Sequence, residues 1–146
     1  MRVLVLAAGA ATLAVGFSTA SGLPGIPKDA QPYKKWHKVN ARPIAPSPSS
    51  AHFGRKNVYT SKLTARGRYP YGTIIVKQGV EPGKRFVGLI AIMRKQRGAD
   101  PKHGDWRWEE FTRTSAGARF QLAGKDAVCW GCHMLARKTD WVYTQR

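Results

Sequence analysis

Short apolar segments rich in β-branched residues follow one another through the middle of the chain. Three of them are residues 58–60, 73–77 and 87–93, each bounded by glycine or proline. A fourth starts at Trp106 and alternates aromatic with polar residues at first, as a strand with one aromatic face does. The connections are too short for crossover helices, so we expect these strands to pair in an antiparallel sheet.

Helices are expected only at the two ends of this sheet. Residues 32–38 predict a short first helix, with Pro32 near its start. Residues 41–50 carry three prolines and three serines and predict a surface loop. A second helix is expected around residues 126–137, followed by a short aromatic end at 141–143. The expected class is α+β, dominated by the antiparallel sheet.

The first 20 residues have the pattern of an export signal. Arg2 is followed by an apolar run over residues 3–17 and by Ser18-Thr19-Ala20, a small-x-small cleavage pattern. The run of about 15 residues is shorter than the roughly 20 that cross a bilayer as a helix. We therefore expect cleavage near Ala20, a periplasmic or secreted product and no membrane span. A flexible tail, residues 21–30, and one domain, residues 31–146, would remain.

The chain is strongly basic, with a net charge of +17 from 25 lysines and arginines and 8 acidic residues. Basic proteins can bind nucleic acid. Here the basic residues are scattered singly or in pairs such as Lys34-Lys35, and no basic helix or RNA-binding aromatic signature accompanies them. We expect a solvated basic surface that favours an acidic partner protein, and no nucleic-acid binding.

The strongest chemical signal is Cys129-Trp-Gly-Cys132-His133, in the second expected helix. C-x-x-C-H is the attachment pattern of c-type haem. Cysteines three apart on a helical turn point the same way, so both sulfurs can reach the vinyl groups of one porphyrin. His133 would then present an imidazole nitrogen to the iron as the proximal ligand. We expect one haem c, covalently attached.

Three other uses of these cysteines are weaker. A zinc site needs four ligands, and no second pair of ligands accompanies this motif. A thioredoxin-like dithiol belongs at the start of a helix within a βαβ unit, whereas the preceding strands are expected to be antiparallel. A structural disulfide across two residues is uncommon. These two are also the only cysteines of the chain.

The late position of the motif narrows the class of haem protein. Only 13 residues follow His133, and Met134 is the only methionine among them. This excludes a small electron-transfer cytochrome with an early motif and a distant downstream methionine ligand. A four-helix cytochrome c′ needs long amphipathic helices, which residues 58–111 do not supply.

Several segments in the same order resemble the cytochrome P-460 family and its sheet-built relatives, the cytochromes c′-β. They are residues 69–77 (Tyr-Pro-Tyr-Gly-Thr-Ile-Ile-Val-Lys), 93–95, 98–106, 129–133 and 139–144. The resemblance covers roughly residues 33–144. It implies a five-coordinate haem iron that oxidises hydroxylamine, with or without nitric oxide, and a protein that often forms homodimers.

The resemblance also implies a role for Lys77. P-460 proteins carry a lysine bonded to the porphyrin rim, and their segment is similar to residues 72–77 here, so Lys77 would be the cross-linking and catalytic lysine. Many relatives have an acidic residue directly after this lysine, where this chain has Gln78. A neutral, desolvated lysine can act as a nucleophile.

Oxidation of a nitrogen ligand requires a base on the open side of the iron. Arg55 or Lys56 resembles the position of a distal arginine in the family, and Arg55 is the candidate catalytic residue. The family's distal carboxylate has no counterpart, because Arg94-Lys95 stands at the corresponding place. Glu109 and Glu110 are acids nearby, and alternation along the strand turns at least one of them to solvent.

Three hypotheses for the function stay open. The first is a P-460-like hydroxylamine oxidase, and the second is a cytochrome c′-β-like protein that binds nitric oxide or carbon monoxide without turnover. The third is a six-coordinate electron carrier in which Met93 or a distal histidine completes the iron. We expect Met93 to pack in the core and His52 and His103 to lie on the surface. Aromatic residues are expected to wall the haem, namely Trp106, Trp108, Phe111 and Trp141.

Overall fold

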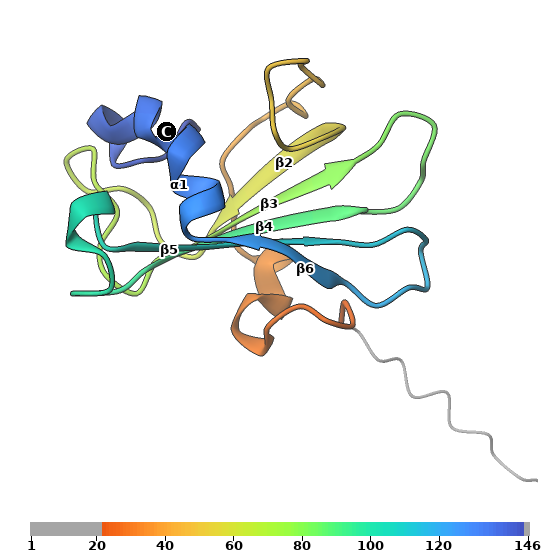
Figure 1. Ribbon diagram of the computed structural model, residues 1–146, viewed down its shortest axis with the longest axis horizontal. Helices are drawn as coiled ribbons and strands as arrows, with labels where there is room; N and C mark the ends of the chain where they lie inside the picture. Colours follow the sequence, from red (N-terminus) through yellow and green to blue (C-terminus); the bar gives the residue numbers. More distant parts are fainter. Residues whose placement is uncertain (1–21, 145–146) are drawn as a thin grey trace, which may run out of the picture.

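The computed structural model describes residues 22–144 and contains a six-stranded antiparallel sheet whose strands follow one another in sequence order. The export signal expected at residues 1–20 lies outside the described residues. Helix α1, Ala127–His133, lies on one side of the sheet, and the 3-10 helix η1, Lys28–Lys35, lies on the other (Figure 1). The strands are β1 (His37–Lys38), β2 (Arg55–Thr60), β3 (Ile74–Val80), β4 (Leu89–Lys95), β5 (Trp106–Thr112) and β6 (Gln121–Lys125). The predicted α+β class is confirmed.

The four expected strands are present. Strand β2 starts three residues earlier than expected and β5 starts where expected, whereas β3 and β4 start one and two residues later and end three and two residues later. The edge strand β6 was not expected, because its sequence, Gln-Leu-Ala-Gly-Lys, is mostly exposed and shows no alternation of apolar residues. A break in register between Glu110 and Phe111 interrupts its pairing with β5. Two further 3-10 helices complete the chain, η2 (Pro101–His103) and η3 (Met134–Thr139).

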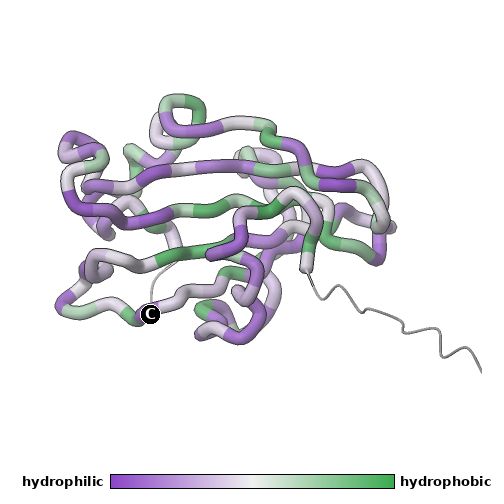
Figure 2. Tube along the Cα trace, turned by 90° about the horizontal axis from the view of Figure 1, so that it is seen from below, coloured by the Kyte–Doolittle hydropathy of each residue, from purple (hydrophilic) through white to green (hydrophobic). Residues whose placement is uncertain are grey.

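Alternate residues of the strands form two separate cores on the two faces of the sheet. The α1 face carries Val58, Ile75, Met93, Trp106 and Trp108, which pack with Trp141 and Val142. The η1 face carries Val76, Ile90, Ile92 and Phe111, which pack with Tyr33 and Phe120. Apolar residues gather in the central strands, whereas hydrophilic residues dominate the connecting loops (Figure 2).

The N-terminal segment is packed where a loose tail was expected through residue 30. Ile26 and Ala30 are buried against the η1 face. The Gln31 amide accepts a hydrogen bond from the Leu23 N–H at 2.7 Å and donates one to the Ile26 carbonyl at 2.7 Å. The segment is ordered because its apolar residues cover one side of the sheet.

The first helix also starts earlier than expected. It occupies Lys28–Lys35 as a 3-10 helix, so that Pro32 lies inside it, rather than residues 32–38. His37 and Lys38 pair instead with Thr60 and Tyr59 as the short strand β1. Within residues 22–144, no helix has the length and apolar character needed to cross a membrane.

Candidate functional site

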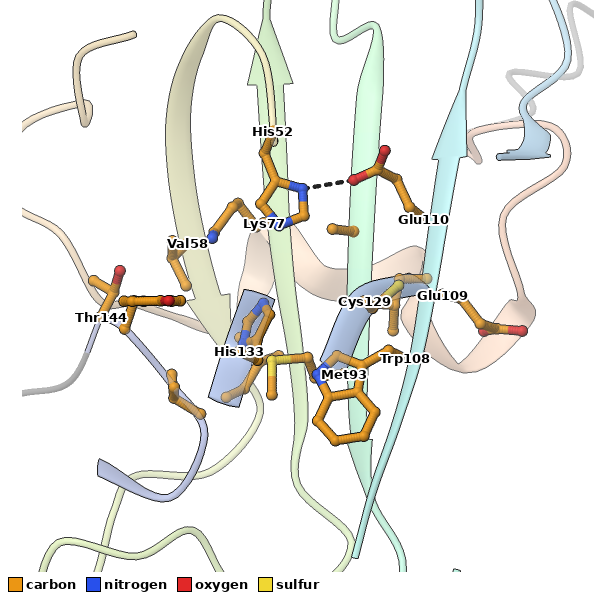
Figure 3. Close-up of a pocket in the computed structure, with 15 residues that line it drawn as sticks. His52, Val58, Lys77, Met93, Trp108, Glu109, Glu110, Cys129, His133 and Thr144 are labelled. Atoms are coloured by element: carbon orange, nitrogen blue, oxygen red, sulfur yellow. Dashed lines mark hydrogen bonds and ion pairs between the residues drawn. The ribbon is translucent and has the colours of Figure 1, made fainter. Parts of the chain in front are cut away.

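A cavity of about 510 Å³ opens between α1, the α1 face of the sheet and the loop before β2. Its volume lies within the range of about 300–1,000 Å³ typical of ligand pockets. A narrower pocket of about 30 Å³ shares several of its walls and extends to Met93 and Trp108 (Figure 3). Residues lining the larger cavity include Ile44, Ser50, His52, Lys56, Lys77, Glu110, Cys129, Cys132, His133, Leu135 and Tyr143.

The start of α1 is fixed by Asp126. The Asp126 carbonyl accepts hydrogen bonds from the N–H groups of Cys129 and Trp130, both at 2.9 Å. Its carboxylate accepts one from Arg107 at 2.8 Å, which ties the turn to β5. Asp126 itself has a positive φ of 43°, which few residues other than glycine adopt. This turn directs α1 back over the sheet.

Both cysteines of α1 line the cavity, and neither forms a disulfide. Burial raises the pKa of the Cys129 thiol to about 11, so this thiol is neutral at physiological pH. Between the cysteines, the Trp130 ring stacks on the His103 ring at a centroid distance of 4.1 Å. That stacking holds the Cys-x-x-Cys turn against the η2 segment.

His133 is buried, with 7% of its surface exposed, and its Nδ1 lies 2.7 Å from the Trp141 carbonyl oxygen. A carbonyl only accepts hydrogen bonds, so Nδ1 carries the proton and Nε2 keeps its lone pair. Burial lowers the pKa of His133 to about 4, an effect that the hydrogen bond to Trp141 opposes. The neutral ring therefore has the form in which histidine binds metals.

A buried ion pair holds the loop that orients His133. The Lys95 ammonium contacts the Asp140 carboxylate, and 8% and 2% of their side chains are exposed. The same carboxylate accepts the Tyr69 N–H at 2.8 Å, and the Asp140 carbonyl accepts the Trp106 indole N–H at 2.8 Å. Asp140 and Trp141 both have positive φ, 54° and 65°. These contacts hold the Trp141 carbonyl where it meets His133.

Lys77 projects from β3 into the cavity. Burial lowers the pKa of Lys77 to about 8, and the Lys56 charge lowers it further while Glu110 raises it. Its neighbour on β4 is Ala91, whose small side chain leaves room beside the lysine. At pH 7 roughly a tenth of the Lys77 population is therefore a neutral amine, far more than for a lysine with an ordinary pKa.

His52 and Glu110 form a pair on the cavity wall that the sequence did not predict. His52 Nδ1 lies 2.6 Å from Glu110 Oε2, with 16% and 22% of the two side chains exposed. Glu110 follows Trp108 by two residues and shares its face, a position that alternation alone could have indicated. Glu109 lies on the opposite face, where it contacts Arg94. No periodic signal marks His52, because it stands in a loop.

The structure places Lys56, and not Arg55, at the cavity. Arg55 is exposed and does not line it, whereas Lys56 is 3% exposed and does. Lys56 Nζ donates to the His52 carbonyl at 3.1 Å and to Ser50 Oγ at 3.4 Å. Burial lowers the pKa of Lys56. This lysine anchors the loop that carries His52.

The other residues considered as iron ligands or haem neighbours lie on both faces of the sheet. Met93 is in the core, as expected, and also lines the narrower pocket. His103 is half-buried rather than exposed, and it pairs with Asp100 at 2.6 Å. Trp108 and Trp141 pack on the α1 face, but Phe111 packs on the η1 face. The expectation that Phe111 walls the haem was wrong, because it is three residues from Trp108 and so faces the other way.

The donors in the cavity suit a haem better than a bare metal ion. Two thiols from one helical turn and one neutral imidazole nitrogen line one space, as attachment and ligation of a c-type haem require. Over residues 22–144, no group of three or more His, Cys, Asp or Glu side chains could hold a metal ion by itself. The residues present therefore fit the cofactor that the motif predicts.

A comparison with family models matches residues 30–144 to the model described as Cytochrome P460. A comparison with curated proteins yields no match. The matched range includes the whole sheet, α1 and every residue of the cavity described above.

Proposed function

Because the chain belongs to the cytochrome P460 family, a family of c-type haem proteins, we propose that it binds and oxidises a small nitrogen compound such as hydroxylamine or nitric oxide. Cys129 and Cys132 would hold the haem through thioether bonds, and His133 would offer Nε2 to the iron. The bound haem supplies a redox-active iron that takes electrons from the nitrogen compound. Turnover would need His133 to be the only protein ligand of the iron, so that the substrate could bind there.

The position of Lys77 carries the proposal. Its side chain lines the same cavity as the three attachment residues, and its pKa of about 8 leaves a reactive neutral amine. Lys77 would hold the porphyrin by a bond from Nζ, and forming that bond would need a two-electron oxidant, such as a peroxide, to take up the hydrogen lost from each of the two bonded atoms. We expect this cross-link in the mature protein.

The cavity also offers groups for the protons. Oxidation of hydroxylamine releases a proton with each electron, and a nearby base speeds that release. Glu110 lies on the cavity wall, paired with His52. The electrons leave to an acceptor, and the net charge of +17 favours an acidic redox protein in that role. Export by residues 1–20 would place both proteins in the periplasm.

An optical spectrum of the reduced protein tests the cross-link. The protein is matured with a c-type attachment system, and Lys77→Ala is compared with Lys56→Ala, which removes the other lysine of the cavity. We expect a strongly red-shifted Soret band in the unmodified protein and in Lys56→Ala, and an ordinary c-type spectrum in Lys77→Ala. An ordinary spectrum in all three would remove the cross-link.

Turnover separates the proposal from gas binding. Hydroxylamine is added with an artificial electron acceptor, and reduction of the acceptor is followed by absorbance. Steady reduction supports the oxidase. Binding of nitric oxide or carbon monoxide without any hydroxylamine-dependent reduction would instead support a cytochrome c′-β-like protein, which the apolar residues Val58, Ile75 and Val142 of the narrower pocket also suit.

A further inference from the structure

The imidazole ring of His52 faces His133 across the cavity. The ring centroids lie 6.3 Å apart with an interplanar angle of 69°, and both residues line both pockets. Figure 3 shows the two rings pointing toward one another, with Lys77 to one side. Two imidazole nitrogens bonded to one metal at about 2.0 Å each would place the ring centres roughly 6 Å apart. The observed separation of the ring centroids is close to that distance.

The hydrogen bonds of His52 also match those of a metal ligand. Histidines that bind metals donate their other ring N–H to a carboxylate or a backbone carbonyl. The Glu110 carboxylate only accepts, so His52 Nδ1 donates to it at 2.6 Å and Nε2 keeps its lone pair. His133 does the same with the Trp141 carbonyl. Each ring therefore has its second nitrogen available.

Other side chains of the described cavity are less suited to this position. Met93 is buried among tryptophans of the α1 face, and Figure 3 shows it beside His133 rather than across from it. His103 stacks on Trp130 and does not line the cavity. Lys56 donates its protons to the His52 carbonyl and Ser50.

We propose that His52 occupies the sixth coordination position of the resting haem iron and is displaced by the incoming small ligand. The proposal rests on the haem bound through His133. His52 stands on a loop and not on a strand, so its ring can swing away while the sheet stays intact. Lys56 and Ser50 hold the His52 carbonyl at 3.1 and 3.0 Å, which keeps the loop close enough for the ring to return. The loop thereby controls access to the iron.

The spin state of the matured ferric protein tests the proposal, by electron paramagnetic resonance and optical absorption. We expect a low-spin signal in the unmodified protein, a high-spin signal in His52→Ala, and return of the low-spin signal when imidazole is added to that variant. The matched control His103→Ala should stay low-spin. A high-spin unmodified protein overturns the proposal, and so does a low-spin signal that survives in His52→Ala. The measurement on the unmodified protein is decisive even if no variant folds.

Carbon monoxide binding to the ferrous protein gives a kinetic readout. If His52 must leave first, the binding rate reaches a plateau at high carbon monoxide concentration. We expect His52→Ala to abolish the plateau and bind at least about tenfold faster. Equal rates that rise linearly in both proteins would contradict the proposal. If the protein is low-spin and does not turn over hydroxylamine, His52 ligation is supported and the oxidase function is contradicted. If the protein is high-spin and turns over hydroxylamine, the oxidase function is supported and His52 ligation is contradicted.

Discussion

The η1 face of the sheet is covered by the protein's own N-terminal segment, whereas the α1 face is filled by protein at one end only. On the η1 face, buried Tyr33 donates its hydroxyl to the Gln78 amide at 2.8 Å. On the α1 face, Trp106 and Trp108 fill the space near the C-terminal loop, and the other end opens into the cavity. The same strands supply both faces, so the difference lies in the residues at alternate positions.

The cavity end of the α1 face carries charged residues where a core would carry apolar ones. Lys56, Lys77 and Glu110 line it, and Lys77 lies directly opposite Val58 on the neighbouring strand. Partial burial of charge costs stability unless a partner compensates for it. Such residues at inward positions indicate a surface shaped for a ligand, because folding alone would favour apolar side chains there.

The largest effect is expected where the α1 face is closed by the Lys95–Asp140 ion pair. Asp140→Asn leaves the Lys95 ammonium buried without its counter-charge, which costs about 3–5 kcal/mol. Asparagine tolerates the left-handed backbone at this position, so the change reports the charge and not the conformation. Urea unfolding of the haem-loaded protein measures the loss. A loss below about 1 kcal/mol would show that the ion pair does not hold this end closed.

At the open end of the α1 face, the free energy of unfolding should increase when Lys77 loses its charge at high pH. In a haem-free protein, made as Cys129→Ala with Cys132→Ala, Lys77 has a pKa lowered from 10.5 to about 8 by burial. Between these two pH values the unfolded chain binds more protons than the folded one, so the free energy of unfolding rises with pH. At about 1.4 kcal/mol per pH unit, the rise is at most about 3 kcal/mol.

Replacing Lys77 by methionine should reduce that rise. Urea unfolding between pH 8 and 10.5 compares Lys77→Met with Lys84→Met, which alters an exposed lysine of a loop. We expect a smaller rise in Lys77→Met than in Lys84→Met, because Lys56, whose pKa burial also lowers, contributes to the rise in both variants. The same slope in both variants would show that another group titrates in this range.

On the η1 face, Tyr33→Phe removes a hydrogen bond without opening a cavity. The Gln78 amide loses its buried donor, which costs about 1–2 kcal/mol. The cost should be the same with and without haem, because the contact lies on the other side of the sheet. Thermal unfolding of both forms measures it, with Tyr71→Phe, an exposed tyrosine bonded to Asp105, as the control. A cost that depends on haem would show that the two faces are coupled.

Alternation along the strands made the sheet and its antiparallel order predictable, and the same rule locates Glu110 beside the cavity. The C-x-x-C-H spacing predicted the attachment residues, because a covalent cofactor demands adjacent thiols and a neighbouring imidazole, and all three line the cavity. His52 was not predictable, since its place depends on a loop anchored by Lys56 and not on any period. The buried N-terminal segment was missed for a similar reason, because its few apolar residues lie between prolines and show no repeat.

The smallest effect is expected for the ion pair on the outer edge of the η1 face. The hydrogen bond from Arg94 lowers the pKa of Asp29 from its ordinary value of 3.8, while burial opposes the change. Asp29 therefore stabilises the fold above pH 3.8, and this contribution is lost as the pH falls through the lower folded-state pKa. Because 48% of the Asp29 side chain is exposed, the contribution stays below about 1 kcal/mol. Glu109 still contacts Arg94 in Asp29→Asn, so the arginine is not left unpaired.

Urea unfolding of the haem-loaded protein is measured at pH 7 and pH 3. The free energy of unfolding should fall slightly more between these two pH values in the unmodified protein than in the variant. Identical losses of stability would mean that the Asp29–Arg94 ion pair adds nothing, and that the buried residues around Tyr33 alone stabilise the η1 face.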